Sequence, residues 1–74
     1  MKPLPIILRA DSDLPLAAQL RQQITWLIAT QAVQPGEKLP SIRELGNQVG
    51  VHFHTVRAVY KQLALDGLIT IRQG

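Results

Sequence analysis

Three basic side chains recur at helical spacing late in the chain, at His54, Arg57 and Lys61. At about 100° per residue they fall on one side of a helix, together with the small Ala58. The apolar residues of the same segment fall on the opposite side: Val56, Val59, Tyr60 and Leu63. A basic stripe of this kind neutralises phosphates and reaches guanine edges, and a small residue within it lets the helix approach a groove closely. The same stripe is also typical of the solvated face of any amphipathic helix, so the neighbouring elements decide its meaning.

A short helix and a tight turn are predicted directly before this segment. Ser41 and Glu44 have the spacing of a capping box, in which the serine accepts a hydrogen bond from the N–H three residues on and the glutamate reaches back to the cap. Gly50 follows about two turns later, where helices end in the left-handed conformation that glycine adopts freely. Gly46 is expected to leave room for a crossing helix. Two helices joined this way are typical of a helix-turn-helix, whose second helix, here near residues 55–65, enters the major groove.

The remaining segments complete the predicted fold. Residues 1–13 are expected to form an extended arm, and residues 14–30 a first helix capped by Asp13 with Pro15 in its first turn. A turn at 34–37 breaks the helical pattern. Residues 38–39 are a candidate for a brief strand, and the β-branched residues 68–71 predict another, followed by the start of a turn at Arg72. A lone strand leaves its backbone unpaired, so we expect the natural protein to continue past Gly74.

The fold class is therefore mainly α with a small β wing: a winged helix-turn-helix of three helices plus a short hairpin that is truncated at the C-terminus. The domain is expected to span residues 14–74, after the arm at 1–13. A chain of 74 residues holds one domain at most.

Composition narrows the function classes. The net charge of +3 is compatible with a polyanionic partner, although many ordinary soluble domains carry as much. Cysteine is absent, which excludes disulfides and thiolate metal sites and fits a reducing cytosol. There is no apolar run of membrane-spanning length and no signal peptide, so we expect a cytoplasmic protein without membrane contact. Its three aromatic residues are too scattered for a base-stacking platform, which favours double-stranded over single-stranded DNA.

An ordered series of motifs resembles the N-terminal domain of the GntR family of transcription regulators. The series runs Leu39-Pro40-Ser41-Ile42-Arg43-Glu44-Leu45, Val51, Thr55-Val56-Arg57, Leu63 and Asp66-Gly67-Leu68, with Leu14-Pro15-Leu16, Gln19-Leu20 and Val33-Gln34-Pro35-Gly36 upstream. The matches span residues 14–74, and their ordered combination is specific although each piece alone is common. The arm and Tyr60 resemble two branches of the family, one with a short effector region and one with an aminotransferase-like domain, and the choice between them stays open.

The resemblance implies that Arg43, Thr55 and Arg57 contact operator DNA and that the wing tip enters the minor groove. The full set of candidate DNA-binding residues is Ser41, Arg43, His52, His54, Thr55, Arg57, Lys61 and Arg72. The expected partners are double-stranded operator DNA and, in the intact protein, a second subunit of a homodimer. A small-molecule effector is expected only in a C-terminal region absent from this chain, and no cofactor is expected.

The chain departs from the family pattern just after Val51, where a small hydroxyl residue and an arginine are usual. Here His52 and Phe53 stand instead. Two interpretations of Phe53 compete: it turns inward as part of the core, or it faces the groove and touches a thymine methyl. We favour the inward one, since large aromatic side chains are more often buried than exposed. Gly46 is a milder departure, from alanine.

Two other function classes have weaker support in the sequence: an enzyme and a protein-binding module. An enzyme is not indicated, because the chain has neither a catalytic triad with supporting spacing nor a glycine-rich phosphate loop. His52 and His54 lack a nearby cysteine or carboxylate that would complete a metal site. The main alternative is a winged helix that contacts protein rather than DNA. Trp26 favours it slightly, since it lies off the apolar stripe of the first helix and packs either on the domain's own edge or arm, or on a partner subunit.

Overall fold

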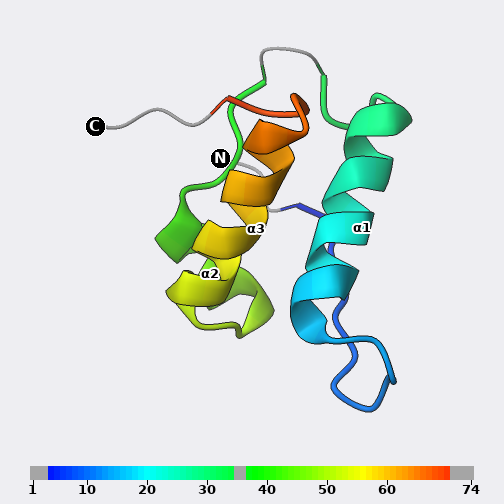
Figure 1. Cartoon of the computed structure of the whole chain (residues 1–74), viewed down its shortest axis with the longest axis vertical. Coiled ribbons are helices and arrows are strands. Elements are labelled where there is room, and N and C mark those ends of the chain that lie inside the picture. The colour runs from blue at the N-terminus through cyan, green and yellow to red at the C-terminus, as the bar shows by residue number, and fades with distance from the viewer. Residues whose placement is uncertain (1–3, 35–36, 71–74) are drawn as a thin grey trace.

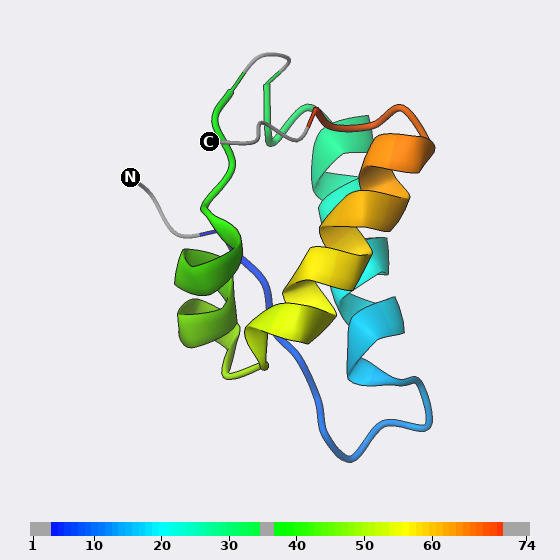
Figure 2. The same ribbon diagram turned by 60° about the vertical axis from the view of Figure 1, so that its left-hand side comes forward.

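The computed structural model describes residues 4–34 and 37–70, which form three α-helices (Figure 1). These are α1 (Leu16–Ala29), α2 (Ile42–Val49) and α3 (Phe53–Leu65). Helix α3 packs against both of the others, and Figure 2 shows it between α2 and α1. The mainly helical fold class and the succession of a short and a longer helix are thus as predicted.

The core is built from the apolar faces of all three helices. Its buried members are Leu20, Ile24 and Leu27 of α1, Leu45 of α2, and Val56, Val59, Tyr60 and Leu63 of α3. Leu4 from the arm and Val33 from the segment after α1 are buried with them. The α3 residues are the ones whose spacing predicted an apolar stripe, so the opposite face of α3 is left to solvent.

Helix α1 begins later than predicted, and Asp13 does not cap it. Its N-cap is Pro15, which makes no side-chain capping hydrogen bond. The hydroxyl of Ser12 instead accepts the N–H of Leu14 at 3.1 Å, within a turn before the helix. The reason is local: the proline ring disfavours helical backbone at the residue before it, so Leu14 cannot join the helix.

Helix α2 has both predicted ends. The Ser41 hydroxyl accepts the Glu44 N–H at 3.0 Å and the Glu44 carboxylate accepts the Ser41 N–H at 2.9 Å. Gly50 closes the helix with φ of 72°. At Gly46 an added Cβ would lie 2.8 Å from the carbonyl oxygen of Val51, so a larger residue does not fit. The nearest obstacle is thus the backbone of the turn, and the first residue of α3, Phe53, follows with backbone atoms at 3.7 Å.

The two predicted strands are not formed in the part of the chain that the structure describes. Neither Lys38 and Leu39 nor residues 68–70 are paired in a sheet, and Ile71 and Arg72 lie outside the described residues. Helix α3 ends at Leu65 with Asp66 as its C-cap, and Gly67 follows with φ of 77°. The Leu68 N–H donates to the carbonyl of Leu63 at 3.0 Å. Short strands are stable only beside a pairing neighbour, and neither segment has one among these residues. The wing therefore stays a prediction.

Three glutamine side chains hold the arm in place, a feature that the sequence did not predict. Each amide donates to the carbonyl and accepts the N–H of one arm residue: Gln48 of α2 with Leu4, Gln23 of α1 with Ile7, and Gln19 of α1 with Arg9. Residues two apart in an extended chain are separated by about 6.7 Å, close to the ~6 Å between residues four apart on a helix. The spacing of Gln19 and Gln23 therefore matches that of Ile7 and Arg9, and the arm runs alongside α1 (Figure 2).

Candidate nucleic-acid interface

The side of α3 that faces away from the core carries the predicted basic stripe. His54, Arg57, Ala58 and Lys61 are all exposed. This separation of basic and apolar side chains confirms what the periodicity predicted. Thr55 lies at the edge of this side and is half-buried.

Arg43 reaches the start of α3 from α2. Its guanidinium carbon lies over the Phe53 ring, 4.7 Å from the ring centroid. The rings of His52, Phe53 and His54 form an aromatic cluster, with centroids 4.3 Å to 4.8 Å apart. The structure thus brings Arg43, His52 and His54 together where α2 and α3 meet, while Arg57 and Lys61 follow along α3.

The inward interpretation of Phe53 is wrong. Phe53 is half-buried and belongs neither to the buried core nor to the partly buried apolar residues packed on it. It is the first residue of α3, and its ring lies beside the Arg43 guanidinium and the imidazoles of His52 and His54. Periodicity could not show this, because the covering residue Arg43 comes from another helix.

His52 is the N-cap of α3. Its Nδ1 accepts the backbone N–H of His54 at 3.2 Å, which requires an unprotonated nitrogen at that position. A histidine here replaces the small hydroxyl or amide residues that usually cap helices. The candidate contact residue His52 therefore has a structural role as the cap of α3, and its ring remains exposed.

Tyr60 fixes the start of α2 against α3, a role that the sequence analysis missed. Its hydroxyl donates to the carbonyl of Pro40 at 2.7 Å, inside the molecule. Burial raises the pKa of Tyr60 to about 12, with a smaller contribution from the charge of Glu44. A buried tyrosine usually finds a partner for its hydroxyl, which is the signal that could have revealed this bond. The bond holds the residue that precedes Ser41, and so helps to set the position of Arg43.

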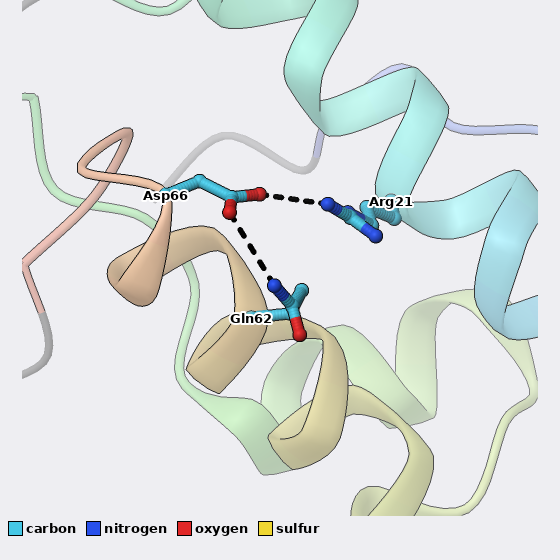
Figure 3. A network of polar contacts seen from close by, with 3 residues as sticks. All are labelled: Arg21, Gln62 and Asp66. Atoms are coloured by element: carbon cyan, nitrogen blue, oxygen red, sulfur yellow. Dashed lines mark hydrogen bonds and ion pairs between the residues drawn. The ribbon is translucent and has the colours of Figure 1, made fainter.

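Opposite charges are paired away from the basic stripe. Arg21 of α1 contacts the Asp66 carboxylate at 2.8 Å, and Gln62 donates to the same carboxylate at 3.3 Å (Figure 3). Over residues 4–34 and 37–70 this is the single ion pair, so Arg43, Arg57 and Lys61 have no carboxylate partner there. Ser41 engages Glu44, and its backbone and side-chain hydrogen bonds lower the pKa of that carboxyl.

Other kinds of site find little support in the described part of the chain. It contains no cluster of three or more His, Asp or Glu side chains that could hold a metal ion. None of its helices combines the length and apolar character needed to cross a membrane. Trp26 is 64% exposed and, with Pro5 of the arm, lines a shallow hollow beside α1.

Comparison with known proteins identifies the family. A model of bacterial regulatory proteins of the gntR family matches residues 16–74. The chain belongs to the GntR family. The GntR match confirms the resemblance seen in the motifs, and the family is one of bacterial regulatory proteins.

Curated GntR relatives are longer than this chain. It is 38% identical over 71 residues to the HTH-type pyridoxine biosynthesis transcriptional regulator PdxR of Corynebacterium glutamicum, a match that covers 96% of this chain and 16% of that protein. It is 36% identical over 63 residues to the HTH-type transcriptional repressor YtrA of Bacillus subtilis, covering 85% of this chain and 48% of that one. The chain thus spans between about a sixth and a half of their length.

A solved GntR structure has the same fold. YtrA from Sulfolobus acidocaldarius, a GntR-family transcription factor, superposes with a TM-score of 0.85 and 40% sequence identity, covering 92% of this chain and 72% of that chain. At this identity the likeness extends beyond the fold to the family.

Proposed function

We propose that this chain binds duplex DNA sequence-specifically, with α3 in the major groove. The observation that carries the proposal is the exposed side of α3, where His54, Arg57 and Lys61 lie together, with Arg57 and Lys61 unpaired by carboxylates in the described residues. Groove-binding helices need such unneutralised cations, because each cation that neutralises a phosphate releases a condensed counterion from the DNA into solution. The small side chain of Ala58 among them lets the backbone of α3 come close to the base edges.

The other candidate residues fit around this helix. In a helix-turn-helix the first helix crosses the DNA backbone, which suits a phosphate contact from Arg43 at the start of α2. Ser41 supports Arg43 by capping that helix. His52 is the N-cap of α3, and Thr55 lies in its first turn. Arg72 is proposed as a wing contact in the minor groove.

The intact regulator is proposed to bind a two-fold symmetric operator as a homodimer in the cytoplasm. One helix-turn-helix supplies few contacts, and a dimer doubles them across half-sites about one helical turn apart or a multiple of it. In this proposal residues 14–74 form the winged helix-turn-helix DNA-binding domain, residues 1–13 form an extended arm before it, and a small-molecule effector binds elsewhere in the protein.

The test is a salt titration of binding to a fluorescein-labelled duplex, followed by fluorescence anisotropy. Arg57→Gln and Lys61→Gln should each weaken binding and lower the slope of log affinity against log salt by about 1. Arg21→Gln, which removes the same charge from the α1 side, is the matched control and should leave the slope unchanged. A chain without salt-sensitive DNA binding would contradict the proposal and favour a protein-binding winged helix.

A further inference from the structure

The contact between Arg43 and Phe53 joins the two helices of the helix-turn-helix through their side chains. The guanidinium carbon lies 4.7 Å from the ring centroid, within the range of a cation–π interaction. The ring is in turn packed by His52 and His54, whose centroids lie 4.7 Å and 4.3 Å from it. Both Arg43 and the two histidines are exposed, so this contact is on the surface of the molecule.

A stacked guanidinium keeps its hydrogen-bonding capacity. A guanidinium has five N–H donors in a planar fork, and a ring near its central carbon leaves donors of that fork available. An arginine held in this way still forms the two parallel hydrogen bonds that a phosphate accepts. It also has fewer conformations to lose on binding, and immobilising a long side chain costs about 0.5–1.5 kcal/mol.

The contact also explains how the chain accommodates its departure from the family pattern. Phe53 carries no charge and is too covered to reach DNA freely, since its neighbours are Arg43, His52 and His54. The Phe53 ring instead lies against the guanidinium of Arg43 from the preceding helix. Phe53 does not belong to the apolar cluster, so its ring is not one of the groups that fill the core.

We propose that Phe53 is a positioning residue for Arg43: its ring, braced by His52 and His54, holds the guanidinium ready for a DNA phosphate. This inference rests on the proposed function, in which Arg43 contacts the DNA backbone. Phe53 acts through Arg43 and makes no contact of its own with a base. The ring therefore increases affinity equally for all sequences and adds no base preference.

A double-mutant cycle tests this on the 74-residue chain, with a labelled duplex of mixed sequence as the probe. Phe53→Leu keeps apolar bulk and removes the ring, and should weaken binding about two- to five-fold, as expected for an exposed cation–π contact. Phe53→Tyr retains the ring and should restore wild-type affinity. In an Arg43→Gln background, Phe53→Leu should have no further effect.

A spectroscopic measurement checks the stacking without DNA. In the wild type and in Phe53→Tyr, the side-chain proton resonances of Arg43 should be shifted upfield by the ring current, with those of Arg21 as the reference. In Phe53→Leu this shift should vanish. An unshifted Arg43 in the wild type would overturn the inference even if a substituted chain fails to fold.

The outcomes distinguish a failure of the positioning role of Phe53 from a failure of the proposed DNA binding. If Arg43→Gln weakens binding while Phe53→Leu does not, or if their losses simply add, the positioning role is wrong and the DNA-binding proposal stands. Tighter binding by Phe53→Leu would mean that the ring withholds Arg43 from DNA, which also overturns it. If the wild-type chain shows no salt-sensitive binding to the duplex, the proposed function and the positioning role fall together.

Discussion

A single hydroxyl links the two helices of the helix-turn-helix at Tyr60. The ring fills the core and its O–H ends at the carbonyl of Pro40, one residue before the cap of α2. Proline has no N–H of its own, so this buried carbonyl is the group that needs a partner there. One side chain thus contributes to packing, satisfies a buried acceptor and holds the helix that carries Arg43.

Tyr60→Phe should lower the free energy of unfolding by about 1–2 kcal/mol, because it leaves the Pro40 carbonyl without its donor. It should also change the response to alkali. The pKa of Tyr60 is raised from 10.0 to about 12 in the folded chain, so the folded state holds the proton more tightly than the unfolded state does. The contribution of the protonated Tyr60 hydroxyl to the free energy of unfolding is therefore complete below pH 10. It is lost as the pH rises toward 12, at about 1.4 kcal/mol per pH unit. Urea unfolding across this range should show that loss in the wild type and not in Tyr60→Phe.

At the scale of the elements, short-range signals predicted what short-range forces determine. Ser41 and Glu44 mark the start of α2, Gly50 marks its end, and Gly67 marks the end of α3, all through hydrogen bonds that span a few residues. The predictions of both ends of α2 and of the end of α3 are confirmed. The start of α1 was misread, since the effect of a proline on the residue before it outweighed a favourable capping residue.

The capping box of α2 should matter to both stability and acid resistance. Ser41→Ala should cost ~1 kcal/mol of stability and weaken DNA binding without altering base preference. The pKa of Glu44 is lowered by its bonds with Ser41, so its contribution is present above the ordinary value of 4.5 and is lost as the pH falls below it. Glu44→Gln keeps an acceptor for the Ser41 N–H and should remove that acid sensitivity. Thermal melts over a pH series would compare the three chains, and an unchanged melting temperature in Ser41→Ala would contradict a working cap.

Helix α1 ends in a strained conformation that offers another test. Gln31, just after the helix, has φ of 62°, which favours glycine over residues with a Cβ. Gln31→Gly should raise the free energy of unfolding by roughly 0.5–1 kcal/mol, less the flexibility that glycine adds to the unfolded chain. Gln31→Ala removes the same side chain without relieving the strain and is the matched control. Equal stabilities of the two variants in urea would mean that the strain is negligible.

At the scale of the whole molecule, the position of the arm and the contact between Arg43 and Phe53 depend on residues that are distant in sequence. Leu4 and Gln48 are separated by 44 positions, and Arg43 meets Phe53 across a turn. No periodicity or motif encodes such pairs, since a glutamine on a helix surface is ordinarily solvated. The sequence therefore predicted an arm and a basic stripe, but neither the glutamines that hold the arm nor the orientation of Phe53.

The arm should be as much a part of the folded unit as the helices, and Gln19 is the residue on which this depends most. Gln19 is 7% exposed, and its amide donates to the carbonyls of Arg9 and Leu14 while accepting the Arg9 N–H. Gln19→Glu keeps the size and the acceptor but turns the donor into a second carboxylate oxygen, which would face two carbonyls and repel them. We expect it to destabilise the chain by about 1–3 kcal/mol, the penalty for buried polar groups left without partners. Hydrogen exchange should then show loss of protection at the Arg9 amide.

Gln22→Glu is the control for that experiment. Gln22 is exposed on the same helix, and its substitution changes the net charge by the same amount. It should leave both the unfolding free energy and the protection of the Arg9 amide as in the wild type. Because the arm bridges α1 and, through Gln48, α2, releasing it at Gln19 should also speed exchange at the Leu4 amide, which Gln48 accepts. Protection that survives Gln19→Glu at both amides would show that the Gln19 bonds are not needed to hold the arm against α1.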